Sequence, residues 1–212
     1  EYVKGAICSP SSQGFIDASG GVKVLSSHDQ ILVGSQYIGC VFPAPVQYIS
    51  QMNESVKKVG KQLHLHGVHG TFGIDFIGFE NGKLLATEIN LRKVGPTHAF
   101  SYVESVIGNT IDSDGFLRNK KGQPIYYVHR RFYEPSILKY LEPKTAVEAL
   151  RSYDLLYKHS TQTGTILHIL SALKPCGYVE ITSIDNNRDK AFELDKQAQK
   201  ALLAKAKLLM RE

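Results

Sequence analysis

The chain has 212 residues, of which 42% are hydrophobic and 21% charged, and it carries a formal net charge of +5 at pH 7. This composition excludes a low-complexity or disordered chain and predicts one large or two small folded domains. No apolar run is long enough to cross a membrane, so we expect no membrane partner.

The first elements that the pattern predicts are two short strands and a helix. Asp17–Gly21 is typical of a turn between a strand at 14–16 and a strand at 22–25. Apolar residues then recur at helical spacing and predict a helix over 46–63. The segment Glu1–Gly5 has neither an initiator methionine nor a signal-peptide pattern, so we expect the chain to be a piece of a longer protein.

A β-hairpin follows, with Asn81-Gly82 between two apolar runs, 70–79 and 84–92. Asn-Gly in this context is the strongest short-range hairpin signal, and loop length fixes the pairing register. A two-residue loop at these positions predicts that Asp75 lies opposite Glu88 and that Gly73 lies opposite Asn90.

Side chains alternate along a strand, so the hairpin is expected to have two different faces. One face carries Asp75, Glu88, Asn90 and Arg92. The other face is apolar and is expected to join the core, with the residues Phe72, Ile74, Phe76, Ile89 and Leu91.

Two opposed carboxylates repel each other unless a cation lies between them. Carboxylate and amide oxygens suit Mg²⁺, which typically also binds substrate phosphates. We therefore predict that Asp75, Glu88 and Asn90 are metal ligands. The alternative is an exposed hairpin whose polar face meets only water or a lysine.

The rest of the chain is predicted to alternate helices and strands. Thr97 is expected to cap a helix from His98 to Val106 that Gly108 ends, and a turn-rich segment over 109–115 marks a domain boundary. Beyond it we expect strands at 125–132, 164–173 and 178–184 and helices at 136–141, 144–156 and 188–210.

The run from Glu88 to His98, together with Asp75, resembles the metal-binding strand pair of ATP-grasp enzymes. The longer match is similar to the pheganomycin-type peptide ligases and to the C-terminal, ATP-grasp-like region of IQ motif-containing protein H. Segments at 9–13, 26–30 and 39–44 resemble the same branch. The resemblance implies an α+β fold: the C-terminal half of an ATP-grasp domain over 1–108, an antiparallel sheet with packed helices, followed by a smaller α+β domain over 109–212.

The resemblance also implies cofactors and further site residues. ATP and Mg²⁺ are the expected cofactors, with Arg92 and His98 as catalytic residues and with His28, Gln30 and Lys93 near the nucleotide. His98 also begins a predicted helix, whose free N–H groups favour an anion. Because the lysines and glycine-rich flap of the family's other half do not occur here, we expect this chain alone to bind ATP weakly or not at all and to be inactive.

Two functions follow as hypotheses. The first is part of an Mg-ATP-dependent carboxylate–amine ligase, which would use ATP, a carboxylate and an amine. The second is a non-catalytic nucleotide-sensing or scaffolding module of a larger, calmodulin-linked regulatory protein, although no IQ motif occurs in this chain.

The cysteines and the basic residues suggest the setting. Cys8, Cys40 and Cys176 are widely spaced and odd in number, which argues against a disulfide framework and favours the cytoplasm. The basic residues form no long block, so a nucleic-acid partner is not favoured. The His64-x-His66 pair and His69 lack a further ligand nearby, so we interpret them as loop histidines and not as a zinc site.

Overall fold

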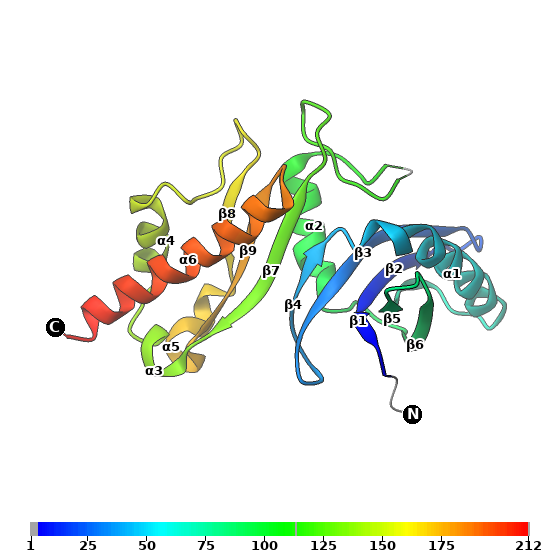
Figure 1. The fold of residues 1–212 in the computed structure, drawn as a ribbon, viewed down its shortest axis with the longest axis horizontal. Helices are drawn as coiled ribbons and strands as arrows, with labels where there is room; N and C mark the ends of the chain where they lie inside the picture. Colours follow the sequence, from blue (N-terminus) through cyan, green and yellow to red (C-terminus); the bar gives the residue numbers. More distant parts are fainter. Residues whose placement is uncertain (1–3, 113, 212) are drawn as a thin grey trace. The chain divides into compact units, whose positions relative to one another are not determined.

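A computed structural model describes residues 4–112 and 114–211 of the chain (Figure 1). The described residues form two compact units. The first is made of those in Glu1–Ser105 and Asn109–Leu117, and the second of Val106–Gly108 and those in Arg118–Glu212. The domain boundary that we placed between residues 108 and 109 stays a prediction.

The first unit is an antiparallel sheet with a long helix against one face. Its elements are β1 (Ala6–Cys8), β2 (Pro10–Ile16), β3 (Val22–Val33), β4 (Gln36–Phe42), α1 (Val46–Leu65), β5 (Gly70–Phe79), β6 (Leu84–Asn90) and the start of α2 (Pro96–Ile107). Strand β5 pairs with β2 on one side and with β6 on the other, so β6 forms an edge of this sheet. The strands predicted at 14–16 and 22–25 lie within the longer β2 and β3, and the predicted helix and the two strands of the hairpin are present.

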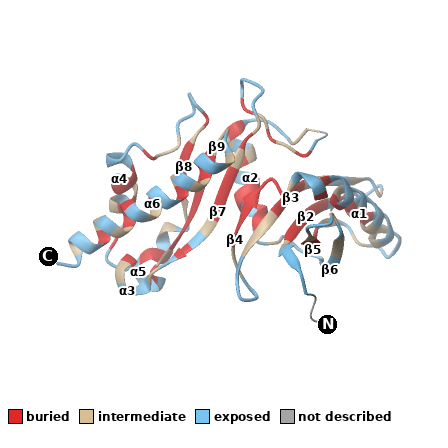
Figure 2. Cartoon of the chain, viewed as in Figure 1, coloured by how far each residue is buried: buried red, intermediate tan, exposed pale blue. Residues whose placement is uncertain are grey.

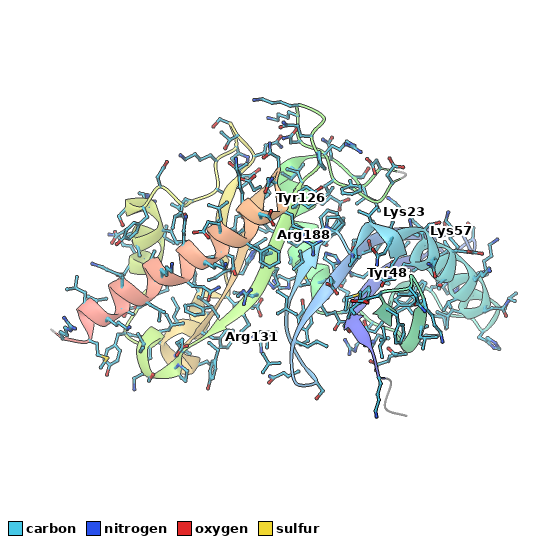
Figure 3. The ribbon with its side chains drawn as sticks, in the orientation of Figure 1. Lys23, Tyr48, Lys57, Tyr126, Arg131 and Arg188 are labelled. Carbon is cyan, nitrogen blue, oxygen red and sulfur yellow. The ribbon has the colours of Figure 1, made fainter. Side chains whose placement is uncertain are left out.

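Helix α1 packs on the sheet through one face only. Figure 3 labels a residue from each face: Tyr48 is fully buried and donates from its hydroxyl to the Phe79 carbonyl oxygen at 2.6 Å, whereas Lys57 is exposed. Buried residues gather on the strands and on the helix faces that cover them (Figure 2). The core between α1 and the sheet consists of Ile16, Ala44, Tyr48, Met52, Val56, Phe72, Ile74 and Phe76.

Gly60 lets α1 approach the sheet closely. A Cβ atom at this position would lie 2.6 Å from Val22 Cγ1 and 3.2 Å from Phe72 Cζ. Replacing a helix-interior glycine by alanine normally stabilises by about 1 kcal/mol. Here we expect Gly60→Ala to lower the free energy of unfolding by about 1 to 2 kcal/mol, because overpacking outweighs that gain.

Urea denaturation of Gly60→Ala, Val22→Ala and the double variant tests this expectation. If the clash with Val22 is the cause, the loss in the double variant is smaller than the sum of the two single losses. Additive losses, or a stabilised Gly60→Ala, would show that the close approach does not matter.

The β5–β6 hairpin has the predicted pairs but not the predicted turn. Phe79 and Lys83 bond across the turn (Phe79 N to Lys83 O, 3.0 Å), so the loop has one residue more than the two that we predicted. A β-bulge then adds Thr87 on β6 between the Asp75–Glu88 and Phe76–Ala86 pairs. The extra loop residue and the bulge compensate each other, and Asp75 still pairs with Glu88 and Gly73 with Asn90.

The apolar face of the hairpin is buried on β5 only. Phe72, Ile74 and Phe76 are at most 1% exposed, but Ile89 and Leu91 are 48% and 56% exposed. The prediction that these last two residues join the core is therefore wrong. The physical reason is that α1 lies over β2 and β3, and the edge strand β6 falls outside its cover.

Helix α2 begins earlier than predicted. Pro96 is its first residue, a position where the missing N–H of proline costs no hydrogen bond. Thr97 therefore lies inside the helix and is not its cap. Gly108 follows the helix with a φ of +79°, which confirms the predicted helix end.

The second unit is a three-stranded antiparallel sheet, in the order β7-β9-β8, with α6 along one face. Its elements are β7 (Tyr126–Tyr133), α3 (Pro135–Leu138), α4 (Pro143–Ser152), β8 (Gly164–His168), η1 (Leu170–Ala172), α5 (Leu173–Cys176), β9 (Tyr178–Asp185) and α6 (Arg188–Leu209). The strand predicted over 164–173 is too long: Ile169 adopts a left-handed φ of +54° and ends it at His168. No helix in the described part of the chain has the length and apolar character needed to cross a membrane.

A buried ion pair joins α6 to the sheet of the second unit. Arg130 Nε lies 2.7 Å from Asp195 Oδ2, and the aspartate side chain is only 1% exposed. Burial raises the pKa of Asp195 to about 6 even though Arg130 lowers it. Around this pair, the apolar side chains of α6, β7 and β9 form the core of the unit.

Candidate functional site

The predicted metal ligands lie together in the first unit, where β5 and β6 pair. Asp75 is opposite Glu88, and Asn90 is one pair further along the same face. Asn90 Nδ2 donates to Asp75 Oδ2 at 3.2 Å, so its carbonyl oxygen is the atom that Asn90 has to offer to a cation. Asn90 is buried and Glu88 is exposed, so the group reaches from the sheet to the surface.

The charge on this group is not balanced within the hairpin. Burial raises the pKa of Asp75 above its ordinary value, and the neighbouring Glu88 carboxylate raises it further, while Ser11, Gln30 and Arg92 oppose the rise. The donor set of two carboxylates and an amide oxygen is the chemistry that Mg²⁺ prefers. The residues present therefore fit this metal.

Gln30 joins the group from β3. Its Nε2 donates to Asp75 Oδ1 at 2.8 Å, so each carboxylate oxygen of Asp75 accepts one amide hydrogen. We predicted Gln30 as a nucleotide-binding residue; in the structure its side chain fixes the orientation of Asp75. A contact between Gln30 and a nucleotide stays a prediction.

His28 is the other predicted nucleotide residue on β3, and it is fully buried. Its ring lies 5.4 Å from the ring of Phe42 and 5.9 Å from that of Phe100. In this arrangement His28 packs between β4 and α2. Its role at a nucleotide stays a prediction.

The segment that follows β6 carries the two predicted cationic residues. Arg92 and Lys93 are both exposed, and Arg92 Nη1 donates to the Lys93 carbonyl oxygen at 3.2 Å. Val94 crosses β5 at Gly73, where a Cβ atom would lie only 2.9 Å from Val94 Cγ1. The absence of a side chain at Gly73 therefore allows this segment to lie close to the metal-ligand group.

A buried polar network holds the same segment, and the sequence analysis missed it. Thr97 Oγ1 accepts from Val94 N at 2.9 Å and donates to Gln13 Oε1 at 2.5 Å, and Gln13 Nε2 donates to Ser26 Oγ at 3.0 Å. These side chains tie the start of α2 to β2 and β3. The available signal was the row of polar residues in β2, all of which are buried.

Lys93 and His98 line a hollow in the first unit with a volume of about 520 Å³. Its other walls are Val94, Thr97, Ser101, Tyr102 and Ser105. His98 is exposed and lies in the first turn of α2, where free N–H groups favour anions. Two predicted site residues thus line the same hollow.

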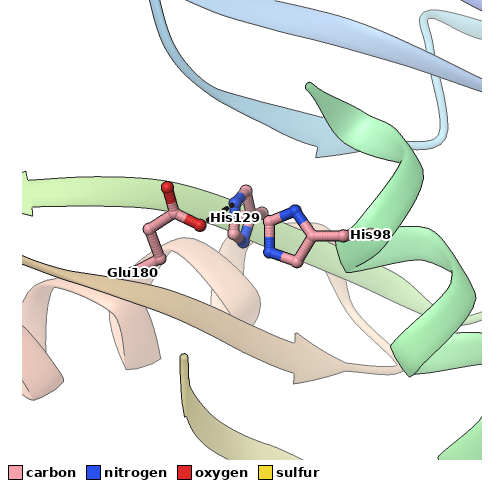
Figure 4. A group of neighbouring side chains, drawn as sticks. All are labelled: His98, His129 and Glu180. Atoms are coloured by element: carbon pink, nitrogen blue, oxygen red, sulfur yellow. Dashed lines mark ion pairs between the residues drawn. The ribbon is translucent and has the colours of Figure 1, made fainter. Parts of the chain in front are cut away.

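The second unit also has a polar sheet face, on the side of β7 opposite to Arg130. Thr182 Oγ1 lies 2.9 Å from His129 Nδ1 and 2.8 Å from His168 Nε2. Figure 4 shows the pair of His129 with Glu180, in which His129 Nε2 lies 3.6 Å from Glu180 Oε2. Arg131 contacts the same carboxylate at 3.2 Å and lies over the Tyr178 ring.

The chain is similar to several known proteins. Residues 145–198 match the family described as the PGM1 C-terminal domain. The chain is 43% identical over 202 residues to L-propargylglycine–L-glutamate ligase of Streptantibioticus cattleyicolor. That match includes 95% of this chain and 42% of the ligase, so the chain spans less than half the length of this relative.

Solved structures give the fold. The ATPase subunit of phosphoribosylaminoimidazole carboxylase from Aquifex aeolicus matches with a TM-score of 0.61 and 14% identity, over 95% of this chain and 57% of that one. Biotin carboxylase from Campylobacter jejuni, in a complex with β,γ-ATP, matches with a TM-score of 0.60 and 15% identity, over 96% and 50%. The chain has part of the ATP-grasp fold. As in the prediction, its α+β architecture is part of an ATP-grasp fold.

Within this ATP-grasp fold, the described residues bring most of the predicted site residues into one region of the first unit. Asp75, Glu88, Asn90 and Gln30 form the hairpin group, and Lys93 and His98 face the adjoining hollow. Arg92 lies close enough to lower the pKa of Asp75. Their roles toward metal, nucleotide and substrate stay predictions.

Proposed function

We propose that this chain is part of an ATP-dependent ligase that joins a carboxylate to an amine, with substrates of the amino-acid class. The observation that carries the proposal is the pairing of Asp75 with Glu88 beside Asn90, which concentrates oxygen ligands and negative charge at one place on the sheet. The relationship to an amino-acid ligase supports the substrate class.

Asp75, Glu88 and Asn90 are the residues that would hold Mg²⁺ with ATP. When bound there, Mg²⁺ would neutralise negative charge on the ATP phosphates. Gln30 orients Asp75 by its 2.8 Å hydrogen bond. In the proposal, Arg92 stabilises negative charge on the activated carboxylate. In the proposal, Lys93 and His98 bind phosphate or the carboxylate of the acceptor in the hollow that they line, and His28 supports the nucleotide side.

Such a reaction needs no protein nucleophile. ATP phosphorylates the carboxylate, and the amine then displaces phosphate from the acyl phosphate. The protein's contribution is to hold the reactants in place and to neutralise charge. We place this reaction in the cytoplasm as part of the proposal.

Calorimetric titration of MgATP into the full-length protein tests the metal group. We expect Glu88→Gln to weaken MgATP binding by at least about tenfold, since loss of a metal-associated ligand typically costs this much or more. Glu80→Gln is the matched control, because Glu80 is an exposed glutamate at the turn of the same hairpin. Equal binding by wild type and Glu88→Gln would contradict the proposed ligand set.

ADP release with mixtures of amino acids separates catalysis from sensing. A ligase releases ADP only when the right carboxylate and amine are present. MgATP binding without ADP release under any mixture would instead favour the non-catalytic regulatory module, the alternative that the sequence left open.

A further inference from the structure

The second unit has a hollow of about 320 Å³ beside α6, separate from the residues of the proposed ligase site. It lies between α6 and the connection that follows α4, two segments that run near each other in Figure 1. Its walls are Tyr153, Leu155, Gln197, Lys200, Ala201 and Ala204. The volume is at the lower end of the range of small-molecule sites.

The inner walls of the hollow are apolar. Leu155 and Ala201 are buried to 6% and 5% exposure and form its floor, while the small side chain of Ala204 leaves room above α6. Tyr153 is 62% exposed at the mouth. Apolar walls of this kind favour an aliphatic or aromatic body over a polar one.

The backbone at the mouth of the hollow is held in an uncommon conformation. Asp154, which separates Tyr153 from Leu155, has a φ of +57°, a region that residues other than glycine rarely adopt. Hydrogen bonds from Asp154 N to Arg151 O and from Leu155 N to Leu150 O keep it there. These two bonds form a Schellman motif, a common way for an α-helix to end, and they fix the backbone that carries Tyr153 and Leu155.

The rim of the hollow carries a positive charge. Residues three and four positions from Lys200 on α6 are Lys196, Gln197, Leu203 and Ala204, none of which is acidic. Among the described residues no ion pair includes Lys200. The acid beside Tyr153, Asp154, pairs with Lys158 at 2.6 Å. An anionic group of a ligand could therefore pair with the Lys200 ammonium group, which has no acidic residue three or four positions away on α6.

We propose that this hollow binds a small organic carboxylate with an apolar body. The body packs on Leu155, Ala201 and Ala204 beside the Tyr153 ring, and the carboxylate pairs with Lys200. A free acid and the apolar C-terminus of a peptide share this chemistry, and the small volume favours the free acid. The proposal does not depend on the ligase function.

NMR of alanine methyl groups in the full-length protein, with 3-phenylpropionate as probe, tests this site. We expect saturable shifts of the Ala201 and Ala204 methyl signals. The neutral isostere 3-phenylpropanamide should bind about tenfold more weakly, because it lacks the charge, and acetate should give no saturable shift. Equal affinity for the acid and the amide would overturn the proposal. So would a titration in which neither the Ala201 nor the Ala204 methyl signal shifts.

Variants separate the charge from the apolar walls. Lys200→Gln should abolish the preference for the acid over the amide, while Lys207→Gln, which removes the same charge elsewhere on α6, should keep it. Ala204→Leu fills the hollow at a position exposed on α6 and should abolish binding of both probes with the fold retained. An N-acetylated dipeptide ending in phenylalanine should bind more weakly than the probe; tighter binding would contradict the free acid as occupant.

Discussion

Replacing Arg130 with methionine is expected to lower the free energy of unfolding by about 3 to 5 kcal/mol at pH 8, because removal of one partner leaves a buried charge unpaired. Asp195 is 1% exposed, and Arg130 Nε lies 2.7 Å from its carboxylate. Methionine retains the apolar stem, so the loss reports mainly on the charge.

The loss in free energy of unfolding caused by Arg130→Met is expected to depend on pH, because Asp195 changes its protonation state. This pKa is raised from 3.8 to about 6, mainly by burial. The folded protein therefore holds the proton more tightly than the unfolded chain, and the contribution of Asp195 to stability falls as pH rises from about 4 to 6. Without Arg130 the pKa of Asp195 rises further, so in Arg130→Met the stability continues to fall above pH 6. Wild type and Arg130→Met should therefore differ less in stability at pH 5 than at pH 8.

Urea denaturation at pH 5 and pH 8 measures this difference. Adding Asp195→Asn to Arg130→Met should recover most of the stability lost at pH 8, since no buried carboxylate remains. Arg151→Met, at an exposed position near the end of α4, should change little at either pH. A loss of the same size at both pH values, or no recovery in the double variant, would contradict the buried-charge explanation.

Local sequence signals were enough to predict the elements that position the site. Helix α1 and the β5–β6 hairpin were predicted because apolar spacing and Asn81-Gly82 act within a few residues of one another. The exact pairing was correct for a reason that the sequence did not reveal. The loop is one residue longer than predicted, and the bulge at Thr87 restores the register.

Burial on the hairpin was predictable only in part, because it depends on which helix covers which strand. Ile74 and Ile89 are paired neighbours on one face, yet Ile74 is 0% exposed and Ile89 is 48% exposed. The alternation of side chains along a strand assigns a residue to one face of the sheet. Whether that residue is buried depends on how far α1 extends over the sheet. The same limit applies to the Thr97–Gln13 contact, which joins residues 84 positions apart in the sequence.

Asp75→Asn is expected to have opposite effects on activity and on stability. If the full-length protein is the proposed ligase, loss of this carboxylate should lower ADP release by about 100-fold or more, as for other groups that stabilise transition-state charge. In the absence of metal and nucleotide, the same change should stabilise the fold at neutral pH. Burial and the Glu88 carboxylate raise the pKa of Asp75, so its ionised form costs stability in the apo protein.

The sign of the stability change follows from proton binding. Because the pKa of Asp75 is higher in the folded than in the unfolded state, its ionisation destabilises the fold increasingly as pH rises above the ordinary value of 3.8. The gain from Asp75→Asn should therefore be largest at neutral pH and vanish below about pH 4. Urea denaturation in EDTA at pH 4 and pH 7.5 measures it.

Asp17→Asn is the matched control in the same unit. Hydrogen bonds from Ser19 and Gly21 lower the pKa of Asp17, so its ionised form stabilises the fold and its loss should destabilise at neutral pH. Adding MgATP should then stabilise wild type and Asp17→Asn but not Asp75→Asn. A strong loss of apo stability in Asp75→Asn at every pH would instead mean that Gln30 and Asn90 use this carboxylate to hold the sheet together. In that case Asp75 would be structural, and the repulsion with Glu88 would no longer point to a cation.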